Sequence, residues 1–208
     1  MKLTIRNDGW VSCKSSFYRV SDILNPNDVF EFHSGINRLY GEIDSGIFAI
    51  SYLISMYDKI PKNEKKLLFS PHVATLDGKE ISLSSLTKLA CYLDDSSYPL
   101  FSSKKSARKL IEKGLKKSKL PYTVNEVFDF FKVQDFHRDI AISSSGTERM
   151  KIMAAVGFAY GKEIFCFPWF SKMRSQAFGK HPEYAMYTLE ALNKIVIVPE
   201  SNNQSDVK

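Results

Sequence analysis

The alternation of hydrophobic and polar positions predicts two strands near the start of the chain. Residues 1–7 (MKLTIRN) and 29–35 (VFEFHSG) alternate in this way, as half-buried strands do. Residues 36–41 (INRLYG) lead from the second strand into a loop with two glycines. Beyond the loop, residues 47–57 (IFAISYLISMY) are apolar on nearly every side, which is typical of a buried helix.

A hairpin is predicted around the pair Asp77 and Gly78. Residues 66–83 alternate on both sides of this pair, and Asp-Gly favours the tight turn that joins two antiparallel strands. Residues 86–95 (LTKLACYLDD) are then expected to form a short helix that runs into a strand.

Three helices are predicted in the second half of the chain. Between residues 103 and 120 the apolar side chains fall on one helical face and basic residues cover the rest. Thr123 and Glu126 have the spacing of a capping box, so a second helix is expected to begin there. The third helix lies within residues 146–161 and ends at a glycine.

The remaining strands of this half are short and continuously apolar. Residues 163–167 (EIFCF) and 194–198 (KIVIV) are typical of strands buried in a parallel sheet, and each follows a helical pattern. The order of strands and helices predicts an α/β fold in which helices connect parallel strands. The polar residues 201–208 are expected to form a disordered tail.

Composition places the chain among ordinary globular proteins. The chain has 208 residues, 44% of them hydrophobic, so residues 1–200 are expected to form a single domain with one core. No apolar run reaches the ~18 residues of a membrane span, and we expect a cytoplasmic protein. The cysteines and histidines lack the spacing of a disulfide framework or a metal site, so no metal is predicted.

The net charge of +6 arises mainly from residues 102–121. This basic helix has two interpretations. In the first, the helix contacts a membrane surface or nucleic acid. In the second, its basic residues form a solvated face over a small core. Because the excess of charge is local, nucleic acid is not the expected partner.

Gly41 and Gly46 have the spacing of the glycines in a phosphate-binding P-loop, between a predicted strand and a predicted helix. The other positions of the loop oppose nucleotide binding. Ile47 stands where the P-loop lysine would reach the outer phosphates, and Phe48 stands where a hydroxyl would bind magnesium. Asp44 adds negative charge to a loop that would have to hold an anion.

Residues 144–170 (SSGTERMKIMAAVGFAYGKEIFCFPWF) resemble the signature helix and following strand of an ATP-binding-cassette (ABC) ATPase. Ser145, Gly146 and Glu148 match the family's L-S-G-G-Q/E pattern, and Thr147 replaces its second glycine. The glycine loop, the hairpin and the last apolar strand follow in the family's order. The resemblance implies a P-loop NTPase-like core with an antiparallel β subdomain and a reduced helical subdomain, which is inserted over residues 96–143.

The family's catalytic positions hold other residues. Pro168 and Trp169 stand where the resemblance places the magnesium-binding Asp and the catalytic Glu. Glu200 stands at the switch His, and Asp95 stands at the Q-loop glutamine. Neither proline nor tryptophan can bind magnesium or activate water. We therefore predict no catalytic residue, no ATP hydrolysis and no cofactor in the chain's own site.

One role in nucleotide binding remains for the signature-like residues, at the site of a partner subunit. In ABC dimers, the resemblance implies, each nucleotide lies between the P-loop of one subunit and the signature of the other. Ser145, Gly146 and Glu148 would then face ATP and magnesium bound on a partner, in a homodimer or in a heterodimer with an ABC ATPase. The alternative is that Ser145 and Glu148 form a capping box at the start of a helix.

Two functions follow from these observations. The first is a catalytically inactive ABC-type nucleotide-binding-domain homologue, a pseudo-ATPase subunit of an ABC transporter or related assembly that reaches the membrane through a transporter subunit. The second is a soluble regulator or scaffold of the same fold that binds protein or an anionic surface through the basic helix. A weak ATPase with a catalytic group displaced to Asp95 or Glu200 ranks below both. The aromatic residues 165–170 are expected to fill the core or, alternatively, to form a partner-binding patch.

Overall fold

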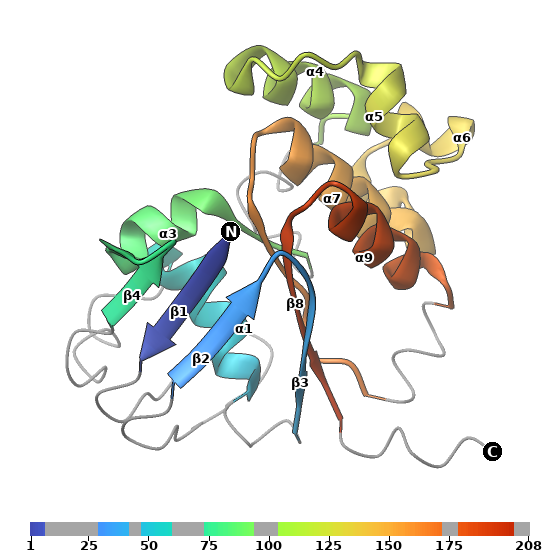
Figure 1. The fold of residues 1–208 in the computed structure, drawn as a ribbon. Coiled ribbons are helices and arrows are strands. Elements are labelled where there is room, and N and C mark those ends of the chain that lie inside the picture. The colour runs from blue at the N-terminus through green and yellow to red at the C-terminus, as the bar shows by residue number, and fades with distance from the viewer. Residues whose placement is uncertain (7–28, 42–46, 60–72, 94–103, 172–178, 202–208) are drawn as a thin grey trace.

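A computed structural model describes residues 1–6, 29–41, 47–59, 73–93, 104–171 and 179–201. These residues form two sheets with helices packed around them (Figure 1). Most of the tail for which disorder is predicted, residues 202–208, lies outside the described ranges. No helix among the described residues combines the length and the apolar character that a membrane crossing requires.

The first sheet is antiparallel, with the strand order β2-β1-β4-β5. Its strands are β1 (Lys2–Arg6), β2 (Val29–His33), β4 (Val73–Leu76) and β5 (Lys79–Ile81). Asp77 and Gly78 join β4 to β5 with φ angles of 50° and 76°, the left-handed conformation that both central residues of a type I′ turn adopt. The predicted hairpin and both predicted N-terminal strands are confirmed.

The second sheet is parallel, with the strand order β3-β8-β7-β6. Its strands are β3 (Gly35–Tyr40), β6 (Ala90–Tyr92), β7 (Ile164–Cys166) and β8 (Ile195–Glu200). Every residue of β6, β7 and β8 is buried, as their unbroken apolar sequences require when both faces of a sheet are covered. Both apolar runs in the second half of the chain are confirmed as parallel strands.

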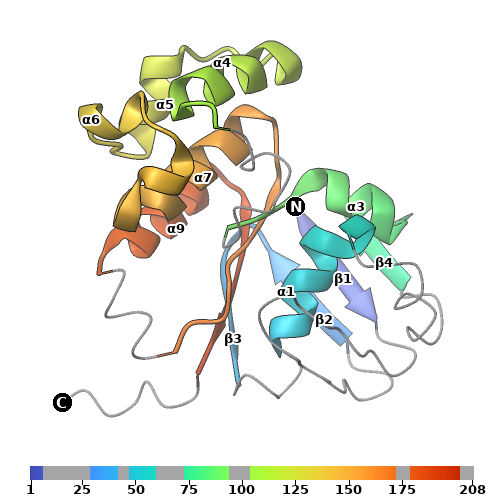
Figure 2. The ribbon, with the colours of Figure 1, turned by 180° about the vertical axis from the view of Figure 1, so that it is seen from behind.

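Helices lie on both sides of the parallel sheet (Figure 2). On one side α1 (Ile47–Met56) packs against β6, β7 and β8, and α3 (Leu83–Leu89) lies beside it. On the other side are α7 (Arg149–Ala159) and α9 (His181–Ala191). α1 is followed by the short helix η1 (Tyr57–Lys59). The predicted buried helix after the glycine loop is therefore confirmed.

A further layer of helices packs on α7 at the top of Figure 1. It consists of α4 (Ala107–Ser118), α5 (Val124–Phe130) and α6 (Asp135–Arg138), and the short helices η2 (Ile142–Ser144) and η3 (Gly146–Glu148) lead from it into α7. α4 is the predicted basic helix. The predicted capping box begins α5, because the Thr123 hydroxyl accepts the Glu126 N–H at 3.3 Å and the Glu126 carboxylate accepts the Thr123 N–H at 2.7 Å.

Candidate functional site

The carboxyl ends of β3, β8 and β7 meet at one edge of the parallel sheet. Tyr40, the last residue of β3, pairs with Glu200, the last residue of β8, and Cys166 at the end of β7 pairs with Ile197 of β8. Ligands of open α/β sheets bind outside the carboxyl ends of the strands. This edge, which is at the lower end of β3 and β8 in Figure 1, is therefore the candidate site.

Gly41 begins the glycine loop at this edge. It is buried, and its N–H donates to the Glu200 carbonyl at 2.9 Å, which extends the pairing of β3 with β8 by one residue. Ile47 and Phe48 form the start of α1, as a P-loop followed by a helix would place them. Asp44 and Gly46, together with Asp95 at the Q-loop position, lie outside the described residues.

Trp169 connects the segment after β7 to the start of the glycine loop. Its indole Nε1–H donates to the Gly41 carbonyl at 3.0 Å, and the residue before it, Pro168, is buried. Phe167 and Phe170 on either side are also buried, at 0% and 2% exposure. Most of the aromatic segment thus fills the core, and Trp169 ties two chain segments together at the edge. The indole is partly buried, and an indole N–H that is withdrawn from water usually finds a hydrogen-bond partner.

Glu200 forms an ion pair with Arg38 of β3. The carboxylate keeps only 4% of its side-chain exposure, whereas Arg38 keeps 34%. Burial raises the pKa of Glu200 above its ordinary value, and the neighbouring Arg38 opposes this shift. The acid at the switch position is therefore engaged by a cation of the same sheet.

Pro199 interrupts the pairing between β8 and β7. By the register of the two strands, the next ladder bond would run from the N–H of residue 199 to the carbonyl of Phe167. Proline has no N–H, and the Ser51 hydroxyl of α1 donates to the Phe167 carbonyl instead, at 2.9 Å. The helix after the glycine loop thus supplies the hydrogen bond that the strand cannot.

The described side chains at this edge include few groups that can bind a metal or act in catalysis. Pro168 and Trp169 carry no metal ligand, and Glu200 is paired with Arg38. No group of three or more His, Cys, Asp or Glu side chains with metal-binding geometry occurs among the described residues. The edge is held by internal hydrogen bonds that connect β3, β7, β8 and α1.

The signature-like residues form a second cluster, at the start of α7. Ser145 is 1% exposed, and its hydroxyl donates to the Ala141 carbonyl at 3.2 Å. Glu148 is 3% exposed. Gly146 and Thr147 between them are exposed, and Gly146 has a left-handed φ of 54°. The backbone at Gly146 is thus at the surface, whereas the Ser145 and Glu148 side chains point inward.

The alternative of a capping box at Ser145 is wrong. The Ser145 side chain makes no capping hydrogen bond, and α7 begins four residues later, at Arg149. Three-residue turns before α7 bring the Glu148 N–H to the Ser145 carbonyl at 3.1 Å. The Glu148 side chain is therefore free to turn into the interior.

Two residues that the sequence analysis did not single out complete this cluster. Glu148 Oε1 lies 2.7 Å from Lys151 Nζ and 3.0 Å from His181 Nδ1. Lys151, itself buried, also donates to the Lys132 carbonyl at 2.9 Å. The spacing of Glu148 and Lys151, one helical turn, could have indicated this pair. No sequence signal indicates His181, which comes from α9.

The similarity of this chain to known proteins lies in its structure. Neither a protein-family model nor a curated protein sequence matches this chain. Among solved structures, a Pyrococcus furiosus protein assigned as an ABC transporter ATP-binding protein matches with a TM-score of 0.62 and 14% identity, over 99% of this chain and 94% of that chain. The fold is that of ABC transporter ATP-binding proteins.

A second match supports the ABC-type fold. A bacterial Atm1-family ABC exporter with ATP bound matches with a TM-score of 0.56 and 14% identity. The match covers 96% of this chain but only 35% of the exporter chain. The predicted α/β fold class, with its P-loop NTPase-like core and its antiparallel β sheet, is confirmed.

We expect Ser51→Ala to lower the free energy of unfolding by about 1–2 kcal/mol, because the buried Phe167 carbonyl loses its donor. Chemical denaturation gives this value. The matched control is Ser55→Ala, since the Ser55 hydroxyl donates within α1 to the Ser51 carbonyl and its contact outside the helix is with the Cys166 thiol, a weak hydrogen-bonding group. Equal losses in the two variants would contradict the role assigned to Ser51.

We expect Arg38→Met to lower the free energy of unfolding at pH 8 by about 2 kcal/mol. This is less than the about 3–5 kcal/mol lost when a fully buried pair is broken, because Arg38 is partly exposed. Without its cation, the pKa of Glu200 should rise further above the unfolded value of about 4.3. The folded state then takes up a proton before the unfolded state does, so the deficit should shrink as the pH falls from 8 to 5.

Chemical denaturation of Arg38→Met across this pH range measures the effect. The control, Arg38→Met combined with Glu200→Gln, has no titrating group at this position and should lose the pH dependence. A deficit of Arg38→Met that is constant or grows toward pH 5 would show that Glu200 is not the group responsible.

Proposed function

We propose that the protein is a catalytically inactive homologue of ABC-type nucleotide-binding domains that acts as a pseudo-ATPase subunit of an ABC transporter or related assembly. The observation that carries this proposal is the hydrogen bond from Trp169 to the Gly41 carbonyl. An indole stands at the end of β7, where hydrolysis requires a general base and a magnesium ligand. It is held by the first residue of the glycine loop.

The hydrogen bonding of the edge supports this proposal. The Gly41 carbonyl is bonded to Trp169, the Phe167 carbonyl to Ser51 and the Glu200 carboxylate to Arg38. Catalysis of phosphoryl transfer rests on charges and donors that are positioned for the nucleotide. Here the described groups at the same positions are used for internal contacts, so we infer that the chain's own site neither hydrolyses ATP nor requires a cofactor.

The partner in this proposal is an ABC ATPase or a second copy of the chain. Where the partner is an ABC ATPase, the exposed backbone at Gly146 and the exposed Thr147 would face the nucleotide that this partner binds. Ser145 and Glu148 would support this segment from inside, through the bonds to Ala141 and Lys151. In this arrangement the protein is cytoplasmic and reaches the membrane through a transporter subunit.

The isolated protein should show no heat of binding with Mg-ATP in calorimetry and no release of phosphate. The physical reason is that Ile47, Phe48, Pro168 and Trp169 provide neither the cation nor the carboxylates of an active site. An intact ABC ATPase measured in the same buffer is the positive control. Micromolar binding with turnover would contradict the proposal, and loss of that turnover in Glu200→Gln would identify a weak ATPase with a displaced catalytic group.

A second experiment tests the role of the signature-like segment in trans. In the complex with an ABC ATPase that copurifies with the protein, Thr147→Arg should reduce ATP turnover at least about tenfold, because a bulky side chain separates the two sides of the shared site. Val29→Arg is the matched control, since Val29 is 50% exposed on the antiparallel sheet and the charge change is the same. Equal turnover of the two complexes would exclude the role in trans.

A further inference from the structure

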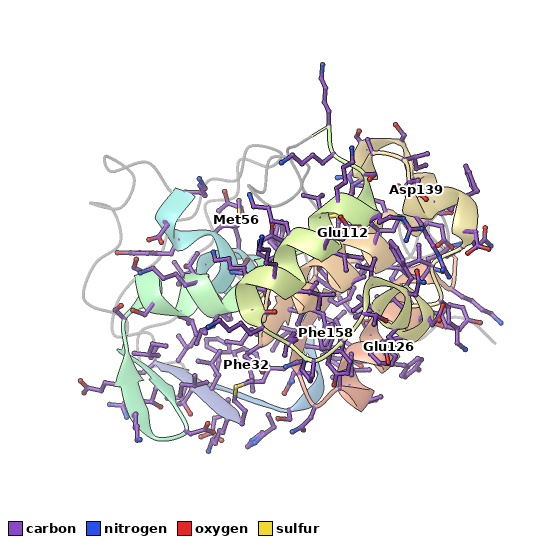
Figure 3. The ribbon with its side chains drawn as sticks, turned by 90° about the horizontal axis from the view of Figure 1, so that it is seen from above. Phe32, Met56, Glu112, Glu126, Asp139 and Phe158 are labelled. Carbon is purple, nitrogen blue, oxygen red and sulfur yellow. The ribbon has the colours of Figure 1, made fainter. Side chains whose placement is uncertain are left out.

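The basic helix α4 lies on the outermost layer of the molecule, at the end opposite the carboxyl ends of the parallel strands (Figures 1 and 2). Figure 3 looks onto this layer from above, with Glu112 of α4 labelled. One face of α4 is buried; its buried residues are Ala107, Leu110, Ile111, Gly114 and Leu115. The other face is exposed, and we call Lys109, Lys113 and Lys116 on that face the lysine row.

The lysine row is a line of cations along the helix. Its members are spaced by four and three residues, so they share one face and span about 10 Å of the helix axis. Among the described interactions, none engages the ammonium groups of these three lysines. Glu112 is the one acidic residue in the sequence of α4.

The other basic residues of α4 are held by contacts within the protein. The guanidinium of Arg108 is bonded to both carboxylate oxygens of Asp139, at 2.8 and 3.2 Å. Lys117 lies over the ring of Tyr160, with its Nζ 6.0 Å from the ring centre. The positive charge that α4 presents to a partner is therefore mainly that of the lysine row.

We propose that the lysine row binds the surface of a membrane that contains anionic phospholipids. Lysine is a compact point charge on a flexible stem, which suits a field of lipid headgroups. Nucleic-acid sites favour free arginines and aromatic side chains that stack on bases, and neither is exposed on α4. All large apolar residues of α4 are buried, so binding is electrostatic, without insertion into the bilayer.

The affinity of such a contact follows from the number of lysines. Each lysine near an anionic surface strengthens binding about fivefold, so the three together contribute about 100-fold. The contact must weaken strongly with salt, because the screening length falls from about 10 Å at 0.1 M to about 3 Å at 1 M. This inference does not rest on the nucleotide proposal, since α4 lies at the end of the molecule opposite the carboxyl ends of β3 and β8 in both views of the fold.

Vesicle flotation tests the proposal with the full chain. We expect the protein to bind phosphatidylcholine vesicles that contain phosphatidylserine and to be released from them by 1 M salt, with no binding to pure phosphatidylcholine. Lys109→Gln, Lys113→Gln and Lys116→Gln in one variant should weaken binding about 100-fold. Circular dichroism should show the same fold, because the changed side chains are exposed.

The matched control removes the same charge from other exposed positions. Lys59→Gln, Lys79→Gln and Lys180→Gln in one variant also lowers the net charge from +6 to +3, and these lysines lie outside α4. The control should bind vesicles nearly as well as the original protein. Equal loss in the two variants, absence of binding to anionic vesicles, or tighter binding to double-stranded DNA or polyglutamate than to vesicles would each overturn the proposal.

Discussion

The pairing of β8 with β3 on one side and with β7 on the other is the constraint on which the candidate site depends. It brings Gly41, Trp169 and Glu200 to one edge, although Trp169 and Gly41 are 128 positions apart in the chain. Backbone groups buried at the end of such a ladder must find partners. At this edge the partners are an indole, a serine hydroxyl and the backbone of the neighbouring strand, so the same bonds that complete the sheet also determine what the edge can do.

The satisfied hydrogen bonds are consistent with a structural edge. Sites that bind ligands commonly retain polar groups without an internal partner, because the ligand supplies that partner. Here the Gly41 and Phe167 carbonyls are both bonded inside the chain. The exception is the second carboxylate oxygen of Glu200, which is buried without a hydrogen-bond partner among the described residues. The free-energy cost of removing this charged oxygen from water without a partner is part of the reason why burial raises the pKa of Glu200.

Periodicity and turn chemistry were sufficient to predict most of the described fold. The Asp77-Gly78 turn, the capping box at Thr123 and the apolar strands β7 and β8 are local features, and local rules describe them well. The contacts of the site are not local. Nothing near Trp169 in the sequence indicates that its indole bonds Gly41, and nothing near Ser51 indicates that it replaces a hydrogen bond that Pro199 cannot make.

The orientation of the Glu148 side chain is another feature that the sequence did not predict. Its position in the signature-like pattern suggested a side chain that faces a partner's nucleotide, yet the carboxylate is buried against Lys151 and His181. An isolated buried carboxylate would be costly, so a buried acid requires a cation or polar groups around it. Lys151 lies three residues further along the chain, in the first turn of α7, but His181 comes from α9, and the packing of α9 against α7 brings it within 3.0 Å. Sequence spacing therefore identified the segment, whereas the tertiary packing decided which of its atoms reach the surface.

The lysine row and the carboxyl edge of the parallel sheet lie at different ends of the fold, which bears on how a membrane contact would affect that edge. Helix α4, which carries the exposed lysine row, lies in the outer helical layer, and the carboxyl edge of the sheet lies at the opposite end (Figures 1 and 2). A protein that rests on a bilayer through α4 would hold its glycine-loop edge away from the lipid. Contact with lipid headgroups therefore does not cover Gly41 or Trp169. Because the charge of the lysine row acts over about one screening length, roughly 10 Å at 0.1 M salt, the proposed contact orients the chain at a membrane without reaching the hydrogen bonds of the far edge.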